Sequence, residues 1–191
     1  MADEMGKPLV QGEAEINKCI WLCNYYIDNT DSFLSSEQIE TEFHKSYISF
    51  QPLGLVFGIM PWNFPYWQVI RFAVPAIAAG NTILLKHASN VSASALQLEK
   101  YFKLAGFPDH VYTAILATSE QMEAVIRNPK IHGVSLTGSF NAGSSVAKIA
   151  GEEVKPSLLE LGGNDAYIIL DDADLDLAVR EGLASRMKNA G

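Results

Sequence analysis

The sequence lacks any long hydrophobic run, although 48% of its 191 residues are hydrophobic. No stretch approaches the roughly 20 consecutive apolar residues that a membrane-spanning helix needs. The opening segment, MADEMGKPLVQGEAE, is too polar and acidic for a secretory signal peptide. We therefore expect a soluble, cytoplasmic, globular protein that does not contact a membrane.

Basic residues are also few, because 14 Lys and Arg stand against 22 Asp and Glu and give a formal net charge of −8. They are scattered along the chain, so the sequence has no positive patch that would attract nucleic acid or an anionic membrane surface. The expected partners are a small molecule and further copies of the same chain.

Cysteine and histidine are scarce. Cys19 and Cys23 are four residues apart, a spacing that matches neither a Cys-x-x-Cys redox motif nor a zinc knuckle and that fits a reducing compartment. The four histidines lie far apart and show no paired ligand spacing. We expect no bound metal ion.

The first half of the chain begins with a predicted helix over residues 14–33, where apolar residues recur at helical spacing. The segment 46–63 is rich in β-branched and aromatic residues and is interrupted by Pro52 and Gly54. This pattern predicts two strands that meet at a turn. We divide the chain into a helical lead-in, residues 1–45, and one α/β domain, residues 46–191.

From residue 54 onward, short apolar runs alternate with helical patterns. Apolar runs that do not alternate in polarity are typical of strands buried on both faces, so the pattern predicts an α/β fold with a doubly wound parallel sheet. Such a Rossmann-like sheet binds ligands at the carboxyl ends of its strands. A further strand, 166–170, and a helix with one apolar face are predicted at the end. The five main strands are 54–59, 82–86, 111–116, 133–138 and 156–163, and the helices between them are 66–79, 92–105, one opened by a Thr118/Gln121 capping box and one that ends at Gly151.

The loop 138–143 joins a predicted strand to a helix. Backbone N–H groups at such a position can hold a phosphate, although the loop also fits an ordinary strand-to-helix turn. The dinucleotide pattern G-x-G-x-x-G is absent, and Ser144 stands where a P-loop requires lysine. Hydrolysis of a nucleoside triphosphate is therefore disfavoured.

Two charged residues end predicted strands. Lys86 lies where the ribose of a dinucleotide would bind, or is a solvated charge at a strand end. Glu160 precedes a turn at Gly162 and Gly163, and is either a general base or a carboxylate paired with a cation elsewhere. The residues alone leave both alternatives open.

The chain contains, in this order, the motifs EMGKPL, PWNFP, PAIAAGNTILLK, SLTGS and LELGGND. Together these five motifs resemble the aldehyde dehydrogenase superfamily in their order and spacing. The resemblance covers residues 5–191, and KHASN, LTGSFNAG and LGGNDAYIILDDADLD are most similar to the succinate-semialdehyde dehydrogenase branch. It implies that residues 46–191 form an NAD(P)-binding domain, and that an aldehyde is oxidised to a carboxylic acid through a cysteine thioester, with NADP or NAD as the cofactor.

The resemblance assigns roles residue by residue. Asn63 matches the asparagine that helps to hold the oxyanion, although it also fits a helix N-cap. Glu160 matches the base that activates the hydrolytic water. Arg71 matches an arginine that faces the carboxylate of succinate semialdehyde, although a solvated helix arginine is the alternative. Cofactor contacts are assigned to Lys86, Gly138 and Ser139 and, in addition, to Met60, Pro61, Trp62, Ser89, Leu161 and Gly162.

One departure concerns the cofactor. Many NAD-preferring relatives carry glutamate three residues after the strand-end lysine, and this chain has Ser89 there. Its absence removes a negative charge that would repel a 2′-phosphate. Lys86 together with His87 could then complement that phosphate, so NADP is admissible.

The second departure concerns the nucleophile, which in the family follows an NAG segment within a few residues. This sequence stops at Asn189-Ala190-Gly191, so we expect a truncated chain without the catalytic cysteine and inactive alone. Cys19 and Cys23 are poor substitutes, because they lie in a helix without a neighbouring base motif. We also expect a homo-oligomer, or association with the missing catalytic part, through a surface that includes the aromatic cluster Trp62, Phe64, Tyr66 and Trp67 unless these residues simply fill the core.

Three hypotheses remain open at this point. The chain is part of an aldehyde-oxidising enzyme, or it is a catalytically silent NAD(P)-binding module. The third, an acyl-phosphate reductase of related fold, is disfavoured because that reaction does not need Glu160 as a water-activating base.

Overall fold

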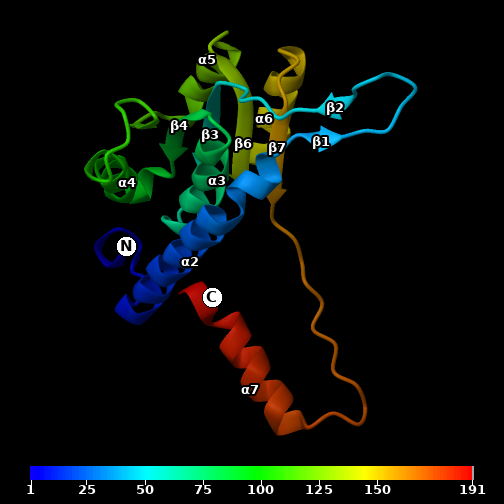
Figure 1. Cartoon of the computed structure of the whole chain (residues 1–191). Coiled ribbons are helices and arrows are strands. Elements are labelled where there is room, and N and C mark those ends of the chain that lie inside the picture. Colours follow the sequence, from blue (N-terminus) through cyan, green and yellow to red (C-terminus); the bar gives the residue numbers. More distant parts are fainter. Residues whose placement is uncertain (191) are drawn as a thin grey trace.

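A computed structural model describes residues 1–190 of the chain, and Gly191, the last residue of the predicted domain, lies outside them. Its centre is a five-stranded parallel sheet in the order β5-β4-β3-β6-β7 (Figure 1). The order runs outward from β3 in both directions, which confirms the predicted doubly wound α/β fold. The strands are β3 (Leu55–Met60), β4 (Thr82–His87), β5 (Tyr112–Ile115), β6 (Ile131–Gly138) and β7 (Ser157–Leu161).

Helices cover both faces of the sheet. On one face α3 (Trp67–Ala78) and α4 (Ser92–Leu104) pack in one hydrophobic cluster with Val56 and Met60 of β3. On the other face α5 (Met122–Arg127) and α6 (Phe140–Glu152) pack with Phe57. Neighbouring residues of β3 therefore point to opposite clusters, which explains why this strand is apolar throughout.

Local signals set most helix ends as predicted, whereas α6 runs one residue past Gly151, to Glu152. Gly80 and Gly106 follow α3 and α4 with φ of 86° each, a backbone conformation that glycine adopts without steric cost. The Thr118/Gln121 capping box opens a short 3-10 helix, η2 (Ser119–Gln121), which leads into α5. A second 3-10 helix, η1 (Ser89–Val91), precedes α4.

The N-terminal segment differs from the prediction in two respects. After α1 (Ala2–Met5), the helix α2 (Leu9–Leu34) is longer than predicted and packs against α3. Two strands do lie within residues 46–63, but the first of them, β2 (Tyr47–Ile48), pairs with β1 (Glu37–Gln38) and not with β3. These two form a separate antiparallel sheet that projects from the body (Figure 1).

The C-terminal segment leaves the sheet. The predicted strand at 166–170 is wrong, because residues 162–170 form neither helix nor strand. Its run of apolar residues is real, but no neighbouring strand within residues 1–190 satisfies its backbone groups. The helix is present as α7 (Leu175–Arg186), followed by η3 (Lys188–Ala190), and stands apart from the sheet in Figure 1. Its predicted apolar face is exposed.

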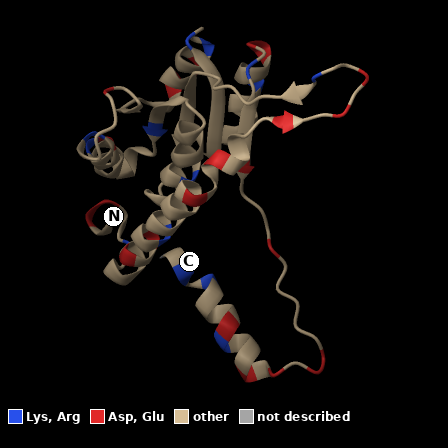
Figure 2. Cartoon of the chain, viewed as in Figure 1, with Lys and Arg blue, Asp and Glu red and all other residues tan. Residues whose placement is uncertain are grey.

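In the view of Figure 2, Lys and Arg residues are scattered over several elements. None of the helices within residues 1–190 is both long enough and apolar enough to cross a membrane.

Candidate functional site

The predicted site residues gather at one edge of the sheet. Met60 ends β3, Lys86 is the next-to-last residue of β4, and Gly138 ends β6. In β7, Glu160 lies beside Thr137 of β6, and the next residue lies beside Gly138. Because all five strands are parallel, these residues share the carboxyl edge, where doubly wound sheets bind ligands.

A small hollow of about 220 Å³ lies beyond the ends of β4 and β5. Three hydroxyl-bearing residues line it, Ser89, Ser92 and Thr118, together with the apolar Ile115 and Leu116. Its described lining residues include no carboxylate. The hydroxyl groups and the apolar wall fit a ribose and an adenine, and a phosphate there would meet no negatively charged side chain among these lining residues.

His87 also lines this hollow, but its ring is almost fully buried. The imidazole is 5% exposed and lies against two carbonyl oxygens, with Nε2 at 2.8 Å from that of Pro65 and Nδ1 at 3.1 Å from that of Met60. Burial lowers its pKa, so the neutral ring is favoured. His87 thus contacts the loop after β3, and its contact with a phosphate stays a prediction.

The loop after β6 has the geometry of a helix start. Ser139 is the N-cap of α6, and its hydroxyl accepts a hydrogen bond from the N–H of Ala142 at 3.3 Å. Gly143, in the first turn, packs so closely on Leu161 that a β-carbon there would lie 2.4 Å from a Leu161 methyl carbon. Glycine thus lets the start of α6 approach the end of β7, beside the predicted pyrophosphate turn.

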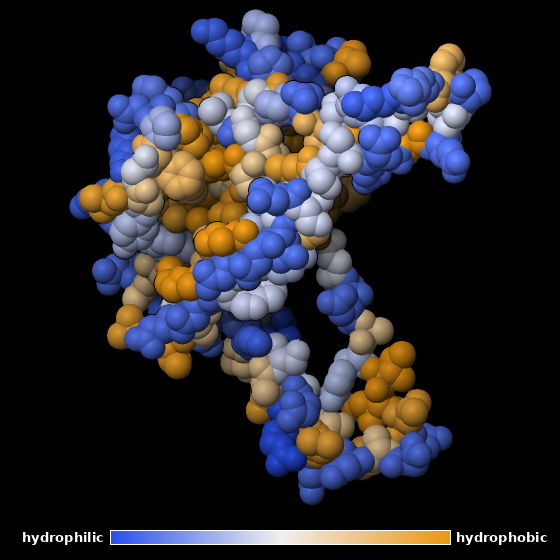
Figure 3. Space-filling model, viewed as in Figure 1, coloured by the Kyte–Doolittle hydropathy of each residue, from blue (hydrophilic) through white to orange (hydrophobic). Residues whose placement is uncertain are grey.

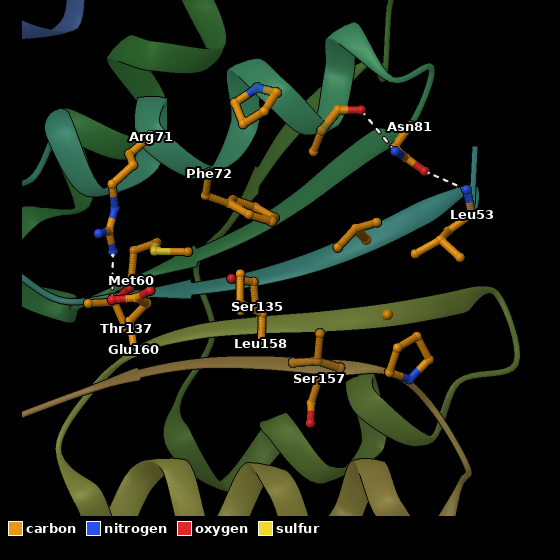
Figure 4. Close-up of a pocket in the computed structure, with 16 residues that line it drawn as sticks. Leu53, Met60, Arg71, Phe72, Asn81, Ser135, Thr137, Ser157, Leu158 and Glu160 are labelled. Atoms are coloured by element: carbon orange, nitrogen blue, oxygen red, sulfur yellow. Dashed lines mark hydrogen bonds and ion pairs between the residues drawn. The ribbon is translucent and has the colours of Figure 1, made fainter. Parts of the chain in front are cut away.

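Arg71 and Glu160 come together, although 88 residues separate them in the sequence. The guanidinium Nη2 of Arg71 lies 3.6 Å from Oε2 of Glu160, and both side chains are part exposed (Figure 4). They stand at one end of a cavity of about 580 Å³, whose walls include Met60 and Phe72. A cation and a carboxylate therefore share the mouth of an apolar hollow, which suits a ligand with one charged end.

Asn63 does not cap α3, so that alternative is wrong. Instead, Glu15 of α2 caps the helix, since its Oε1 accepts hydrogen bonds from the N–H groups of Tyr66 and Trp67 at 2.8 and 2.9 Å. Lys7 donates to the carbonyl oxygen of Asn63 at 3.0 Å. The side-chain Oδ1 of Asn63 is buried and has no hydrogen-bond partner within the described chain.

Lys7 and Glu15 are the residues that the sequence prediction missed. Lys7 lies within the EMGKPL motif, to whose residues the family resemblance assigns no role. Nothing in the local sequence of Glu15 indicates a partner at Tyr66, 51 residues away. The one signal in the sequence was that Glu15 places a carboxylate on the apolar face of a predicted helix.

Two further expectations concern the aromatic cluster and the cysteines. Of the cluster, Trp62 is 44% exposed, whereas Tyr66 and Trp67 pack against the hydrophobic core. Burial, followed by the charge of Glu15, raises the pKa of Cys19 to about 12, and burial also raises that of Cys23. Neither thiol is therefore an activated nucleophile.

Comparison with known proteins identifies the family. The aldehyde dehydrogenase family model matches residues 1–191. A succinate-semialdehyde dehydrogenase [NADP(+)] of Mycobacterium avium is 45% identical over 194 residues, which span all of this chain and 41% of that protein. The chain thus spans about two fifths of the length of the curated relatives it matches.

Solved structures agree with this assignment. The succinic semialdehyde dehydrogenase of Streptococcus pyogenes, solved with NADP+, matches with a TM-score of 0.94 and 39% identity over all of this chain and 42% of its own. A succinate-semialdehyde dehydrogenase of Burkholderia pseudomallei matches with a TM-score of 0.92 and 31% identity, over 98% of this chain and 39% of its own. With its doubly wound sheet and whole-length family match, the chain belongs to the aldehyde dehydrogenase family.

Proposed function

We propose that this chain forms the cofactor-binding part of an NADP-dependent succinate-semialdehyde dehydrogenase. The observation that carries the proposal is the meeting of Arg71 and Glu160 at the carboxyl edge of the sheet, beside the ends of β3 and β6. An arginine at that place suits a substrate with a terminal carboxylate. The relatives from Mycobacterium avium and Streptococcus pyogenes bear the same substrate in their names.

The residues present fit a dinucleotide. Ser89, Ser92 and Thr118 offer hydroxyl groups to a ribose and its 2′-phosphate, and Lys86 supplies a positive charge at the neighbouring strand end. The start of α6 at Ser139 offers backbone N–H groups to the pyrophosphate. We assign further cofactor contacts to residues at the ends of β3, β6 and β7, namely Met60, Pro61, Trp62, Gly138, Leu161 and Gly162.

When bound, the cofactor accepts a hydride from the substrate. Three residues of this chain carry the other roles that we assign. Arg71 holds the substrate carboxylate, the side-chain N–H of Asn63 donates to the oxyanion, and Glu160 takes a proton from the water that hydrolyses the thioester. We keep residues 46–191 as the NAD(P)-binding domain and 1–45 as its lead-in.

Calorimetric titration with both cofactors tests the proposal. NADP should bind at least as tightly as NAD, and Ser89→Glu should weaken NADP binding by roughly tenfold, about 1.4 kcal/mol, while it leaves NAD binding largely unchanged. Ser145→Glu, on the exposed side of α6, is the matched control for the added charge. A clear preference for NAD that Ser89→Glu does not alter would show that the ribose site lies elsewhere.

The alternative, a catalytically silent NAD(P)-binding module, is supported by the raised pKa of both cysteine thiols. The two functions agree on cofactor binding and differ on turnover. We expect the chain alone to produce no NADPH from succinate semialdehyde. Turnover that is lost in Glu160→Gln and kept in a Cys19→Ala/Cys23→Ala double variant would contradict our account of the nucleophile.

A further inference from the structure

A buried ion pair joins the N-terminal segment to the site. Nζ of Lys7 lies 2.5 Å from Oε2 of Glu15, and the two side chains are 2% and 0% exposed. Such a pair is weak evidence for stability, because removing both charges from water offsets most of their attraction. The contacts that the pair makes with other residues therefore matter more than its contribution to the free energy of unfolding.

Each further contact of the pair goes to the same short segment. Lys7 donates to the carbonyl oxygen of Asn63 and lies 4.0 Å from the centre of the Phe64 ring. The other oxygen of Glu15 accepts from the N–H groups of Tyr66 and Trp67, which begin α3. The pair thus holds the 63–67 segment at both its ends.

The opposite side of the same loop is held by His87 of β4. Nε2 of its ring lies 2.8 Å from the carbonyl oxygen of Pro65, so the loop is fixed between α2 and the sheet. Asn63 lies in the middle of this loop, and its Oδ1 is buried without a partner in the described residues. Burying an amide oxygen without a hydrogen bond costs free energy. We therefore expect the side chain of Asn63 to have a role in ligand binding.

We propose that Lys7 and Glu15 are positioning residues that fix the backbone and side-chain orientation of Asn63. The pair acts through the Asn63 carbonyl and through the start of α3, and touches no reacting atom. Describing Asn63 as the oxyanion donor rests on the function proposed above. The positioning itself does not depend on that function, since it concerns only the contacts of this chain.

Nuclear magnetic resonance of the labelled chain tests the proposal without turnover. The carbonyl carbon of Asn63 and the N–H of Phe64 report the hydrogen bond from Lys7, and the side-chain NH₂ of Asn63 reports its order. In Glu15→Gln and in Lys7→Met, both backbone signals should shift. The heteronuclear NOE of the Asn63 NH₂ should fall towards that of Asn24, an exposed asparagine of the same chain.

Glu4→Gln is the matched control. Glu4 is another carboxylate of the N-terminal segment that caps a helix, because it accepts from the N–H groups of Ala93 and Ser94 at the start of α4. Its loss should disturb α4 and lower stability, yet leave the Asn63 signals in place. A merely structural role for Lys7 and Glu15 would give the same result as this control.

Single variants that leave one buried charge unpaired can fail to fold. The double variant Lys7→Met/Glu15→Gln carries no charge at either position and keeps an amide oxygen for Tyr66 and Trp67, so it preserves the test. Unchanged Asn63 signals in this double variant would overturn the proposal. Failure of NADP binding, with Asn63 signals that shift as expected, would instead count against the proposed function alone.

Discussion

The contact between Arg71 and Glu160 is between two part-exposed side chains, 37% and 51% accessible. Exposed ion pairs of this kind contribute about 0–1 kcal/mol. The carboxylate of a ligand can therefore replace Glu160 beside Arg71 at little cost. Under the proposed function the two residues are coupled, because a ligand carboxylate held by Arg71 would free Glu160 to act as the base.

We expect Glu160→Gln to bind succinate roughly two- to fivefold more tightly than the unaltered chain, because the competing carboxylate is gone. Arg71→Gln should lose this binding. Titration by nuclear magnetic resonance measures both, with Arg180→Gln, an exposed arginine of α7, as the control. Equal affinities in Glu160→Gln and the unaltered chain would show that the two residues do not compete.

Because of Cys19, we expect the folded chain to lose stability at alkaline pH. The pKa of Cys19 is raised from 9.0 to about 12 mainly by burial, so the folded state keeps the thiol protonated where the unfolded state does not. The resulting stabilisation is complete below pH 9 and is lost as the pH rises towards 12. The loss amounts to about 1.4 kcal/mol for each pH unit in that interval.

Urea unfolding of the unaltered chain and of Cys19→Ala between pH 8 and 11 measures this loss. The unaltered chain should lose more stability over that interval. Burial also raises the pKa of Tyr66 and Tyr112, but both proteins retain these residues, so the difference isolates Cys19. Parallel curves would mean that the thiol ionises in the folded state as easily as in the unfolded state.

At the scale of single elements, the sequence predicts what local chemistry decides. The capping box at Thr118 and the glycines after α3 and α4 were predicted because each acts within a few residues. The strand at 166–170 was predicted wrongly, because a strand exists only where a neighbour pairs with it. β1 was missed for the converse reason, since its two residues form a strand only through pairing with β2.

Two glycines of α6 test the packing that brings this helix to β7. Gly143 faces Leu161, whereas a β-carbon at Gly151 would meet nothing within 4 Å. Both changes to alanine gain helix propensity, and only Gly143→Ala adds a clash. We therefore expect Gly143→Ala to be less stable than Gly151→Ala by roughly 1–2 kcal/mol in urea unfolding.

Leu161→Ala provides the control for this comparison. Shortening Leu161 removes the methyl groups that the new β-carbon would meet, so the two alanine variants should become equally stable in that background. If the difference between them persists, the cost at Gly143 comes from something other than contact with Leu161.

At the scale of the whole molecule, the fold class was enough to locate the site at one edge of the sheet, but not to predict the side-chain contacts within it. Parallel strands bring Lys86, Gly138 and Glu160 to one edge wherever they lie in the sequence, so their assembly followed from the fold class. The contact of Arg71 with Glu160, and that of Lys7 with Asn63, depend on how helices pack, which local patterns do not encode. The functional roles of exposed polar residues could be predicted only from the family resemblance.

Much apolar surface is left uncovered. The segment before α7 exposes a hydrophobic cluster, visible in Figure 3, in which Ile168 is 77% and Leu170 is 67% exposed. On α7, Leu175, Val179 and Leu183 are each more than 60% exposed. Contiguous apolar surface of this kind is characteristic of an interface, because leaving it in water costs about 25 cal/mol per Å².

We therefore expect the chain to self-associate at micromolar concentration, as sedimentation velocity would show, and to bind a hydrophobic dye. Replacing Leu175, Val179 and Leu183 together by glutamine should weaken association, since these residues form the apolar face of α7. Leu104→Gln, at the end of α4 and 72% exposed, is the control that removes apolar surface elsewhere. A compact monomer that binds no more dye than an ordinary folded protein would rule out an uncovered interface. It would also favour the silent NAD(P)-binding module over a part of a larger enzyme.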